Sequence, residues 1–109
     1  KRTVLFDYDS YTVKSEYRPV VLAHAKYLRD NENASVLLQG HTDERGSREY
    51  NLALGQRRAD SVKNIMFLSG ARDAQVESVS LGEEKPQTTG HDESSWAQNR
   101  RANIVYRGE

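Results

Sequence analysis

The order of strand-like and helix-like segments is the feature that most limits how this chain can fold. Four short segments have the apolar patterns of β-strands, and they span residues 3–8, 35–40, 76–81 and 102–106. Three segments with helical spacing separate them, at about 15–31, 48–68 and 92–99. Such alternation indicates helices packed on a sheet. We therefore predict an α/β (α+β) sandwich of βαβαβαβ order with a four-stranded mixed sheet, in which Val36–Leu38 is buried on both faces.

The composition excludes several kinds of protein. The chain has 109 residues, enough for one core, and we predict a single domain over residues 1–109. It has no cysteine, which excludes disulfides and cysteine nucleophiles from this chain. Its 16 basic and 16 acidic residues cancel, whereas domains that bind nucleic acid have a basic excess as a rule, so no nucleic-acid partner is expected. Because Lys1 stands just before the first strand, we expect that any targeting or anchoring segment lies outside this chain.

The second long helix distinguishes two adjacent arginines. At about 100° per residue, one stripe of this helix is apolar and faces the core; its members are Leu52, Gly55, Ala59, Val62 and Met66. Arg57 points away from the stripe and is expected to be solvated, whereas Arg58 lies at the boundary. The Arg58 stem can cover the core while its guanidinium reaches toward the helix start, near Asp43 in the preceding loop. Glycine inside the stripe costs helix propensity, so Gly55 indicates a close approach to a neighbouring backbone.

Two interpretations fit Arg58 and Asp43. Charges at a helix edge are structural or solvated as a rule, which favours a salt bridge between the two side chains. The alternative is a pair held for a zwitterionic ligand, because a guanidinium binds a carboxylate bidentately and a carboxylate binds an ammonium. The α-centre of an amino acid offers both groups together. Leu54 lies off the apolar stripe and has no obvious partner in the core.

Several motifs, in the same order along the chain, resemble those of the OmpA-like peptidoglycan-binding domain. They are Gly40–Gly46, Tyr50–Asn51 and Leu54–Val62, joined by Phe6–Ser10, Gly82–Pro86, Gly90–Glu93 and Asn99–Ala102. The last four resemble in particular the peptidoglycan-associated lipoproteins (Pal) of that family. The resemblance implies a non-enzymatic domain without cofactors that binds peptidoglycan through the diaminopimelate of its stem peptide. It also implies a periplasmic location, a lipid anchor in the outer membrane, and a role in the Tol-Pal system for envelope integrity and cell division.

The resemblance also assigns residues. The implied peptidoglycan contacts are Asp43, Arg58, Leu54, Asp9, Tyr8 and Thr42. Asp43 and Arg58 hold the diaminopimelate, which agrees with the zwitterion interpretation, and Asn51 is expected to orient the loop. Lipoproteins of this family also bind TolB, a periplasmic propeller protein, and further Tol-Pal and outer-membrane proteins are possible partners. The candidate rim contacts for such a partner are Glu44, Arg45 and Tyr50.

Three other functions compete with peptidoglycan binding. A metal enzyme would draw its ligands from His24, His41, His91, Asp43 and Asp92. No histidine pair has the spacing of helical metal motifs, however, and we expect His24 to be a satisfied core histidine. A peptidoglycan hydrolase would need Glu44, Glu83 and Glu84 as acid and base, yet these are expected to be solvated loop residues. The third is a protein-interaction module whose main ligand is TolB.

Several remaining polar and aromatic residues have structural interpretations. His41 and His91 are expected to be hydrogen-bonding struts in loops. Trp96 is expected to pack over the sheet from the last helix. Arg100 and Arg101 are interpreted as charges at a helix end that interact with the helix dipole.

Overall fold

The four predicted strands form one mixed sheet. The computed structural model describes residues 1–108, and its strands are β1 (Thr3–Leu5), β2 (Val36–His41), β3 (Val76–Gly82) and β4 (Arg101–Tyr106). The sheet has the order β1-β4-β2-β3, so the last strand lies between the first and the second. β4 runs antiparallel to both β1 and β2, whereas β2 and β3 are parallel. The prediction of a four-stranded mixed sheet with helices packed on it is confirmed.

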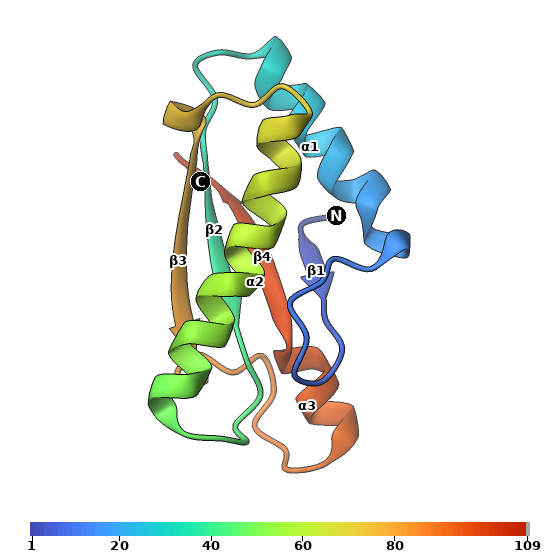
Figure 1. Ribbon diagram of the computed structural model, residues 1–109, viewed down its shortest axis with the longest axis vertical. Helices are drawn as coiled ribbons and strands as arrows, with labels where there is room; N and C mark the ends of the chain where they lie inside the picture. The colour runs from blue at the N-terminus through green and yellow to red at the C-terminus, as the bar shows by residue number, and fades with distance from the viewer. Residues whose placement is uncertain (109) are drawn as a thin grey trace.

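Helices cover one face of this sheet. They are α1 (Arg18–Asp30), α2 (Arg48–Leu68) and α3 (Glu93–Asn99), with short 3-10 turns at Ser15–Tyr17 and Asp73–Gln75. Figure 1 shows α1 and α2 in front of the sheet, with α3 at the lower end of the molecule. Ser47 caps α2, since its hydroxyl accepts a hydrogen bond from the Tyr50 amide at 3.1 Å. Asp92 caps α3 in the same way, through the Ser95 amide at 2.9 Å.

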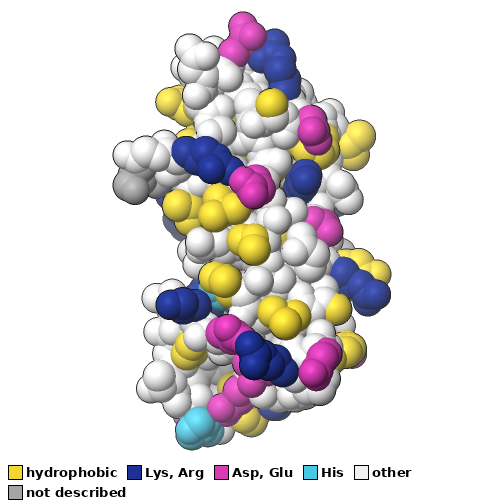
Figure 2. All heavy atoms as spheres, turned by 90° about the vertical axis from the view of Figure 1, so that its left-hand side faces the viewer, with side chains coloured by type: hydrophobic (Ala, Val, Ile, Leu, Met, Phe, Trp, Pro, Cys, Tyr) yellow, Lys and Arg dark blue, Asp and Glu magenta, His cyan; other side chains and the backbone are white. Residues whose placement is uncertain are grey.

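The opposite face of the sheet is only partly covered. Val36 and Leu38 of β2 are fully buried, but Leu37 between them is half-buried. Because side chains alternate along a strand, Leu37 points to the face without helices. The prediction that Val36–Leu38 is buried on both faces is therefore wrong for Leu37, as sheets with antiparallel strands need only one covered face. Figure 2 views the molecule from the side on which β3 lies, where small groups of apolar side chains stand among charges of both signs.

Helix α2 packs on β2 through two glycines. Gly40 lies so close to α2 that an added Cβ would stand 1.7 Å from the Gly55 carbonyl oxygen. A Cβ on Gly55 would meet the Gly40 carbonyl oxygen at 2.9 Å. The predicted close approach at Gly55 is confirmed, and the predicted stripe is buried except for Leu52, which is half-buried. This contact presses the first half of α2 against the end of β2.

Strand β1 is shorter than predicted. It ends at Leu5 instead of reaching Tyr8. Pairing stops because the partner segment of β1 leads back into α3: the Phe6 amide still donates to the Arg100 carbonyl at 2.8 Å, and the residues before Arg100 are helical. Tyr8 and Asp9 therefore lie on a loop instead of a strand.

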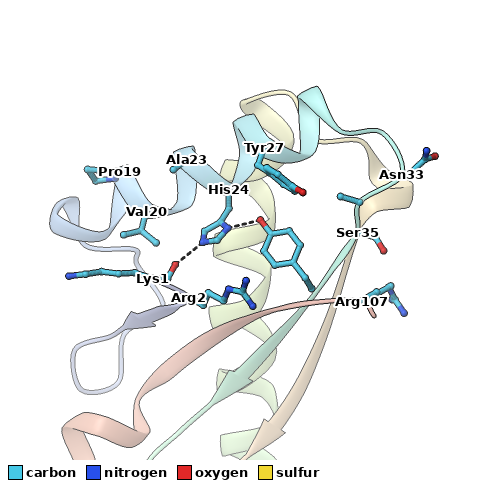
Figure 3. A pocket seen from close by; sticks show the side chains of 12 residues that line it. Lys1, Arg2, Pro19, Val20, Ala23, His24, Tyr27, Asn33, Ser35 and Arg107 are labelled. Atoms are coloured by element: carbon cyan, nitrogen blue, oxygen red, sulfur yellow. Dashed lines mark hydrogen bonds between the residues drawn. The ribbon is translucent and has the colours of Figure 1, made fainter. Parts of the chain in front are cut away.

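A hollow of about 880 Å³ lies between α1 and the ends of β1 and β4. Figure 3 shows His24 of α1 inside it, with one ring nitrogen 2.6 Å from the Tyr106 hydroxyl and the other 2.7 Å from the Lys1 carbonyl oxygen. Both ring nitrogens thus have partners, as predicted for His24, but the prediction that it lies in the core is wrong, because it is half-buried and lines the hollow. None of the residues predicted to bind peptidoglycan lines this hollow.

Candidate ligand-binding site

The residues predicted to bind peptidoglycan lie together around a small cavity at the other end of the helix layer. Its volume is about 70 Å³. Three segments form its wall, namely the loop after β1, the loop between β2 and α2, and the first half of α2. All six predicted contacts line it: Tyr8, Asp9, Thr42, Asp43, Leu54 and Arg58. Two of the three predicted rim residues, Arg45 and Tyr50, line it as well, whereas Glu44 does not.

Arg58 is buried in the cavity wall and holds three backbone segments. Only 1% of its surface is exposed. Its guanidinium donates to the carbonyl oxygens of Asp7, Ser10 and His41 at 3.2, 2.8 and 2.9 Å. Burial lowers the pKa of Arg58 to about 10, although the charge of Asp43 opposes this shift. Since a guanidinium has five N–H groups, two of them are left without a partner among residues 1–108.

Asp43 pairs with two other arginines. Its carboxylate accepts hydrogen bonds from the Arg45 Nε and Nη2 atoms at 3.2 and 2.8 Å, and from the Arg45 amide at 3.0 Å. The Arg100 Nη1 atom lies 3.5 Å away. The interpretation of Asp43 and Arg58 as a structural salt bridge is therefore wrong. Burial raises the pKa of Asp43, but the hydrogen bonds of Arg45 and the charges of both partners outweigh it and hold the pKa below its ordinary value.

The Arg45 side chain lies between two aromatic rings. Its guanidinium carbon is 4.2 Å from the ring centre of Tyr8 and 4.1 Å from that of Trp96, both within cation–π range. The prediction that Trp96 packs over the sheet is wrong, because this ring faces the site and its Nε1 donates to the Glu44 carboxylate at 2.9 Å. The same carboxylate lies 2.6 Å from the His91 Nδ1 atom. Glu44 thus holds Trp96 beside the cavity.

Arg100 is the site residue that sequence reasoning missed. It is interpreted above as a helix-end charge, but it is 7% exposed and its Nε donates to the Phe6 carbonyl at 3.0 Å. Its Nη atoms reach Glu93 at 2.9 Å and Asp43 at 3.5 Å. Arg101 is also buried and bonds to backbone carbonyls. Their position offered a signal, since both arginines lead directly into the apolar strand β4, which lies inside the sheet.

Further contacts tie the loops around the cavity together. The Tyr50 hydroxyl donates to the Asp9 carboxylate, which raises the pKa of Tyr50. Asp9 has a φ of 53°, in the left-handed region, which few residues other than glycine, asparagine and aspartate adopt. The buried Asn51 amide donates to the Asp43 carbonyl at 3.4 Å and to the Glu83 carboxylate at 2.6 Å. These bonds support the prediction that Asn51 orients the loop.

His41 is buried without a hydrogen-bond partner. It is 2% exposed, and neither ring nitrogen has a partner in the described part of the chain. The prediction of a hydrogen-bonding strut is therefore wrong for His41, although it is confirmed for His91. Burial, and then the charge of Arg101, lower the pKa of His41 to about 4. The ring is therefore neutral near pH 7.

The low pKa of His41 predicts a loss of stability on acidification. Between the ordinary pKa of 6.5 and the folded value of about 4, the unfolded chain binds a proton that the folded chain does not. The free energy of unfolding therefore falls as the pH falls through this window, by about 2 kcal/mol between pH 7 and pH 5. Urea melts at pH 7 and pH 5 measure this loss in the free energy of unfolding. His41→Gln should lack this component, and equal losses in wild type and variant would rule out His41 as its source.

The glutamates considered for hydrolysis are engaged in other contacts. Glu83 accepts a hydrogen bond from Asn51, and Glu84 pairs with Arg48 at 2.6 Å. Glu44 is exposed but bonds to Trp96. Within residues 1–108, no group of three or more histidine, cysteine or acidic side chains could hold a metal ion. No helix in the same range has the length and hydropathy needed to cross a membrane.

Comparisons with known proteins agree with this fold. The model of the OmpA family matches residues 5–100. Peptidoglycan-associated lipoproteins of Legionella pneumophila and Pasteurella multocida are 53% and 48% identical over 94% and 95% of this chain, which spans 58% and 69% of their lengths. A crystal structure of the peptidoglycan-associated lipoprotein from Burkholderia pseudomallei matches with a TM-score of 0.97 and 56% identity, over 98% of this chain and 91% of that one. The chain therefore belongs to the OmpA family, and it is similar to the peptidoglycan-associated lipoproteins over nearly all its length.

Proposed function

We propose that this domain binds peptidoglycan non-covalently and tethers the outer membrane to the cell wall. The similar proteins from Legionella, Pasteurella and Burkholderia are named for their association with peptidoglycan, which supports a binding domain instead of an enzyme. In this proposal the recognised group is the diaminopimelate of the stem peptide. Its distal centre carries a carboxylate and an ammonium together, and the cavity offers a partner of opposite charge for each.

The observation that supports the proposal most directly is that Arg58 has two unused N–H groups. Its side chain lines the cavity and keeps two N–H groups beyond those that bond to the backbone. A guanidinium with two such groups can bind one carboxylate through two hydrogen bonds. Asp43 lines the same cavity and offers a carboxylate for the ammonium. A neutral sugar of the glycan strand carries neither charge, so the charged pair favours the peptide part of peptidoglycan.

Other cavity residues suit the remaining parts of this ligand. Leu54 is buried yet lies outside the apolar core cluster, so its side chain is available to the methylene chain of diaminopimelate. Thr42 is buried, and its hydroxyl has no partner within the described residues, which leaves it available for a ligand hydrogen bond. Tyr8 and Asp9 bound the cavity from the loop after β1. We propose these four residues as ligand contacts beside the charged pair.

Stem peptides that end in meso-diaminopimelate are expected to bind, whereas the same peptides ending in lysine should bind at least about tenfold more weakly. Lysine keeps an ammonium for Asp43 but lacks the distal carboxylate, so the N–H groups of Arg58 lose water without gaining a partner. Calorimetry with the two peptides measures the difference. A peptide amidated at the distal carboxyl is the matched control, and it should bind as poorly as the lysine form. Equal affinities for all three peptides would contradict the proposal.

We also propose that TolB shares this surface, which places the domain in the periplasmic Tol-Pal system. The support is the resemblance together with the position of the rim residues. Arg45 and Tyr50 line the cavity itself, and Glu44 holds Trp96 next to it, so a protein that covers the rim would also cover the ligand site. Binding to purified sacculi, measured with and without TolB, tests this proposal. Undiminished binding at saturating TolB would reject a shared surface.

A further inference from the structure

The carboxylate of Asp43 accepts three hydrogen bonds from Arg45 and lies against a second arginine. A carboxylate offers about four lone-pair positions. Oδ1 accepts from the Arg45 amide at 3.0 Å and from the Arg45 Nε at 3.2 Å. Oδ2 accepts from the Arg45 Nη2 at 2.8 Å and forms an ion pair with the Arg100 Nη1 at 3.5 Å. An ammonium group that approaches Asp43 therefore competes with the cations that already hold it.

Among these donors, the Arg45 side chain is the one that can leave without disturbing the fold. The Arg45 amide belongs to the backbone of the loop. Arg100 is buried and is anchored by a backbone carbonyl at 3.0 Å and by Glu93 at 2.9 Å. The Arg45 side chain, in contrast, is 32% exposed; beyond Asp43 it contacts the rings of Tyr8 and Trp96, and it lies 3.9 Å from the exposed Glu93 carboxylate. The Arg45 guanidinium can therefore move into solvent when another cation takes its place beside Asp43.

We propose that Arg45 is an internal competitor for the ammonium group of the ligand and is displaced from Asp43 when the ligand binds. This inference rests on the proposed function, since it assigns a ligand ammonium to Asp43. The size of the cavity supports it: about 70 Å³ is small beside the roughly 300 Å³ or more of ordinary small-molecule sites. Departure of the Arg45 side chain from between Tyr8 and Trp96 would enlarge the cavity where the ammonium must go.

The competition makes Arg45 a determinant of specificity. The two halves of the site differ, because Arg58 already has two unused N–H groups for a carboxylate whereas Asp43 is paired with the Arg45 side chain through two hydrogen bonds. A ligand that carries only an ammonium must replace a guanidinium that is also stacked between two rings, and it gains little in return. A zwitterion also gains the contact of its carboxylate with Arg58, and it can therefore displace the Arg45 guanidinium. The measured affinity is then the intrinsic affinity multiplied by the fraction of molecules in which Asp43 is open.

The single tryptophan of the chain makes this displacement measurable. Trp96 stacks on Arg45, so its fluorescence should change when a stem peptide ending in meso-diaminopimelate saturates the wild-type domain. The Arg45 side chain exchanges far faster than a peptide binds, so the apparent association rate constant of the wild type should be reduced in proportion to the fraction of molecules in which Asp43 is open. Arg45→Ala should therefore associate roughly tenfold faster and bind more tightly, as measured by the fluorescence anisotropy of a dye-labelled peptide. Arg48→Ala is the matched control, because Arg48 is 70% exposed and pairs with Glu84 outside the cavity wall, and it should behave like the wild type.

Two results would overturn the displacement step while the proposed function stands. Weaker peptide binding by Arg45→Ala would show that Arg45 contacts the ligand, and unchanged Trp96 emission at saturating peptide would show that Arg45 stays in place. Arg45→Lys serves if the alanine variant does not fold: it keeps a cation near Asp43 without the planar group, and association no faster than wild type would count against the proposal. A wild-type domain that binds neither peptide nor sacculi would instead refute the proposed function, and this inference with it.

Discussion

The domain with Arg58 replaced by alanine is expected to lose peptidoglycan binding together with about 3 kcal/mol or more of its free energy of unfolding. Arg58 donates to the carbonyl oxygens of Asp7, Ser10 and His41, and alanine leaves all three without this donor. Each buried group left unsatisfied costs about 1–3 kcal/mol, against a total stability of about 5–15 kcal/mol for a small domain. Urea melts and pull-downs with purified sacculi measure the two effects, with binding normalised to the folded fraction.

Arg57→Ala is the matched control for this substitution. Arg57 is the neighbour of Arg58 in sequence, yet its side chain is exposed, as the helical wheel predicted. Its loss should change the free energy of unfolding by less than about 0.5 kcal/mol and leave sacculus binding intact. Equal losses from the two substitutions would show that the two arginines are equivalent, against the geometry of α2.

A methyl group at Gly40 should destabilise the fold by roughly 3 kcal/mol or more. The added Cβ would stand 1.7 Å from the Gly55 carbonyl oxygen. This oxygen belongs to the backbone of α2, so the clash is relieved only if the whole helix moves away from the sheet and the core reopens. Because α2 also carries Arg58, Gly40→Ala should weaken sacculus binding even in the folded fraction. Denaturant melts and the same pull-down give both quantities.

Gly55→Ala separates the packing effect from helix propensity. Propensity alone would stabilise α2 by about 1 kcal/mol. The new Cβ, however, would meet the Ser80 hydroxyl at 2.3 Å and the Gly40 carbonyl oxygen at 2.9 Å. The hydroxyl can rotate away but the carbonyl cannot, so we expect a net loss that is smaller than the loss at Gly40. A gain in stability would contradict the tight contact between α2 and β2.

Helical periodicity is the part of the sequence that predicted the site best. The angular position of a residue on a helix depends only on how many residues separate it from its neighbours. For this reason the wheel of α2 separated Arg57 from Arg58 and marked Gly55 as a contact with another backbone, without any knowledge of the rest of the fold. Strand β1 was predicted less well, because its length depends on where a partner from the other end of the chain stops pairing.

The partners of Asp43 could not be predicted in the same way. Asp43 and Arg45 lie in a loop, where no periodicity fixes the direction of a side chain. Arg100 and Trp96 reach the site from the last helix and its end, and only the three-dimensional fold brings them there. The family resemblance indicated Asp43 and Arg58 as ligand contacts, but it did not indicate the arginines that pair with Asp43. Arg58 was therefore the cation expected beside Asp43, instead of Arg45 and Arg100.

The central position of β4 determines when this sheet can form during synthesis. β4 lies between β1 and β2 although it is the last of these four strands in sequence, and β1 pairs with no other strand among residues 1–108. A nascent chain in which β4 has not yet been made can therefore pair β2 with β3 and dock α2, but it leaves the β2 edge open and β1 unattached. Long-range closure of this kind is slow, and an unpaired apolar edge invites association with other chains. The synthesis of β4 thus decides whether the sheet closes, and until then the chain depends on whatever protects such edges in the cell.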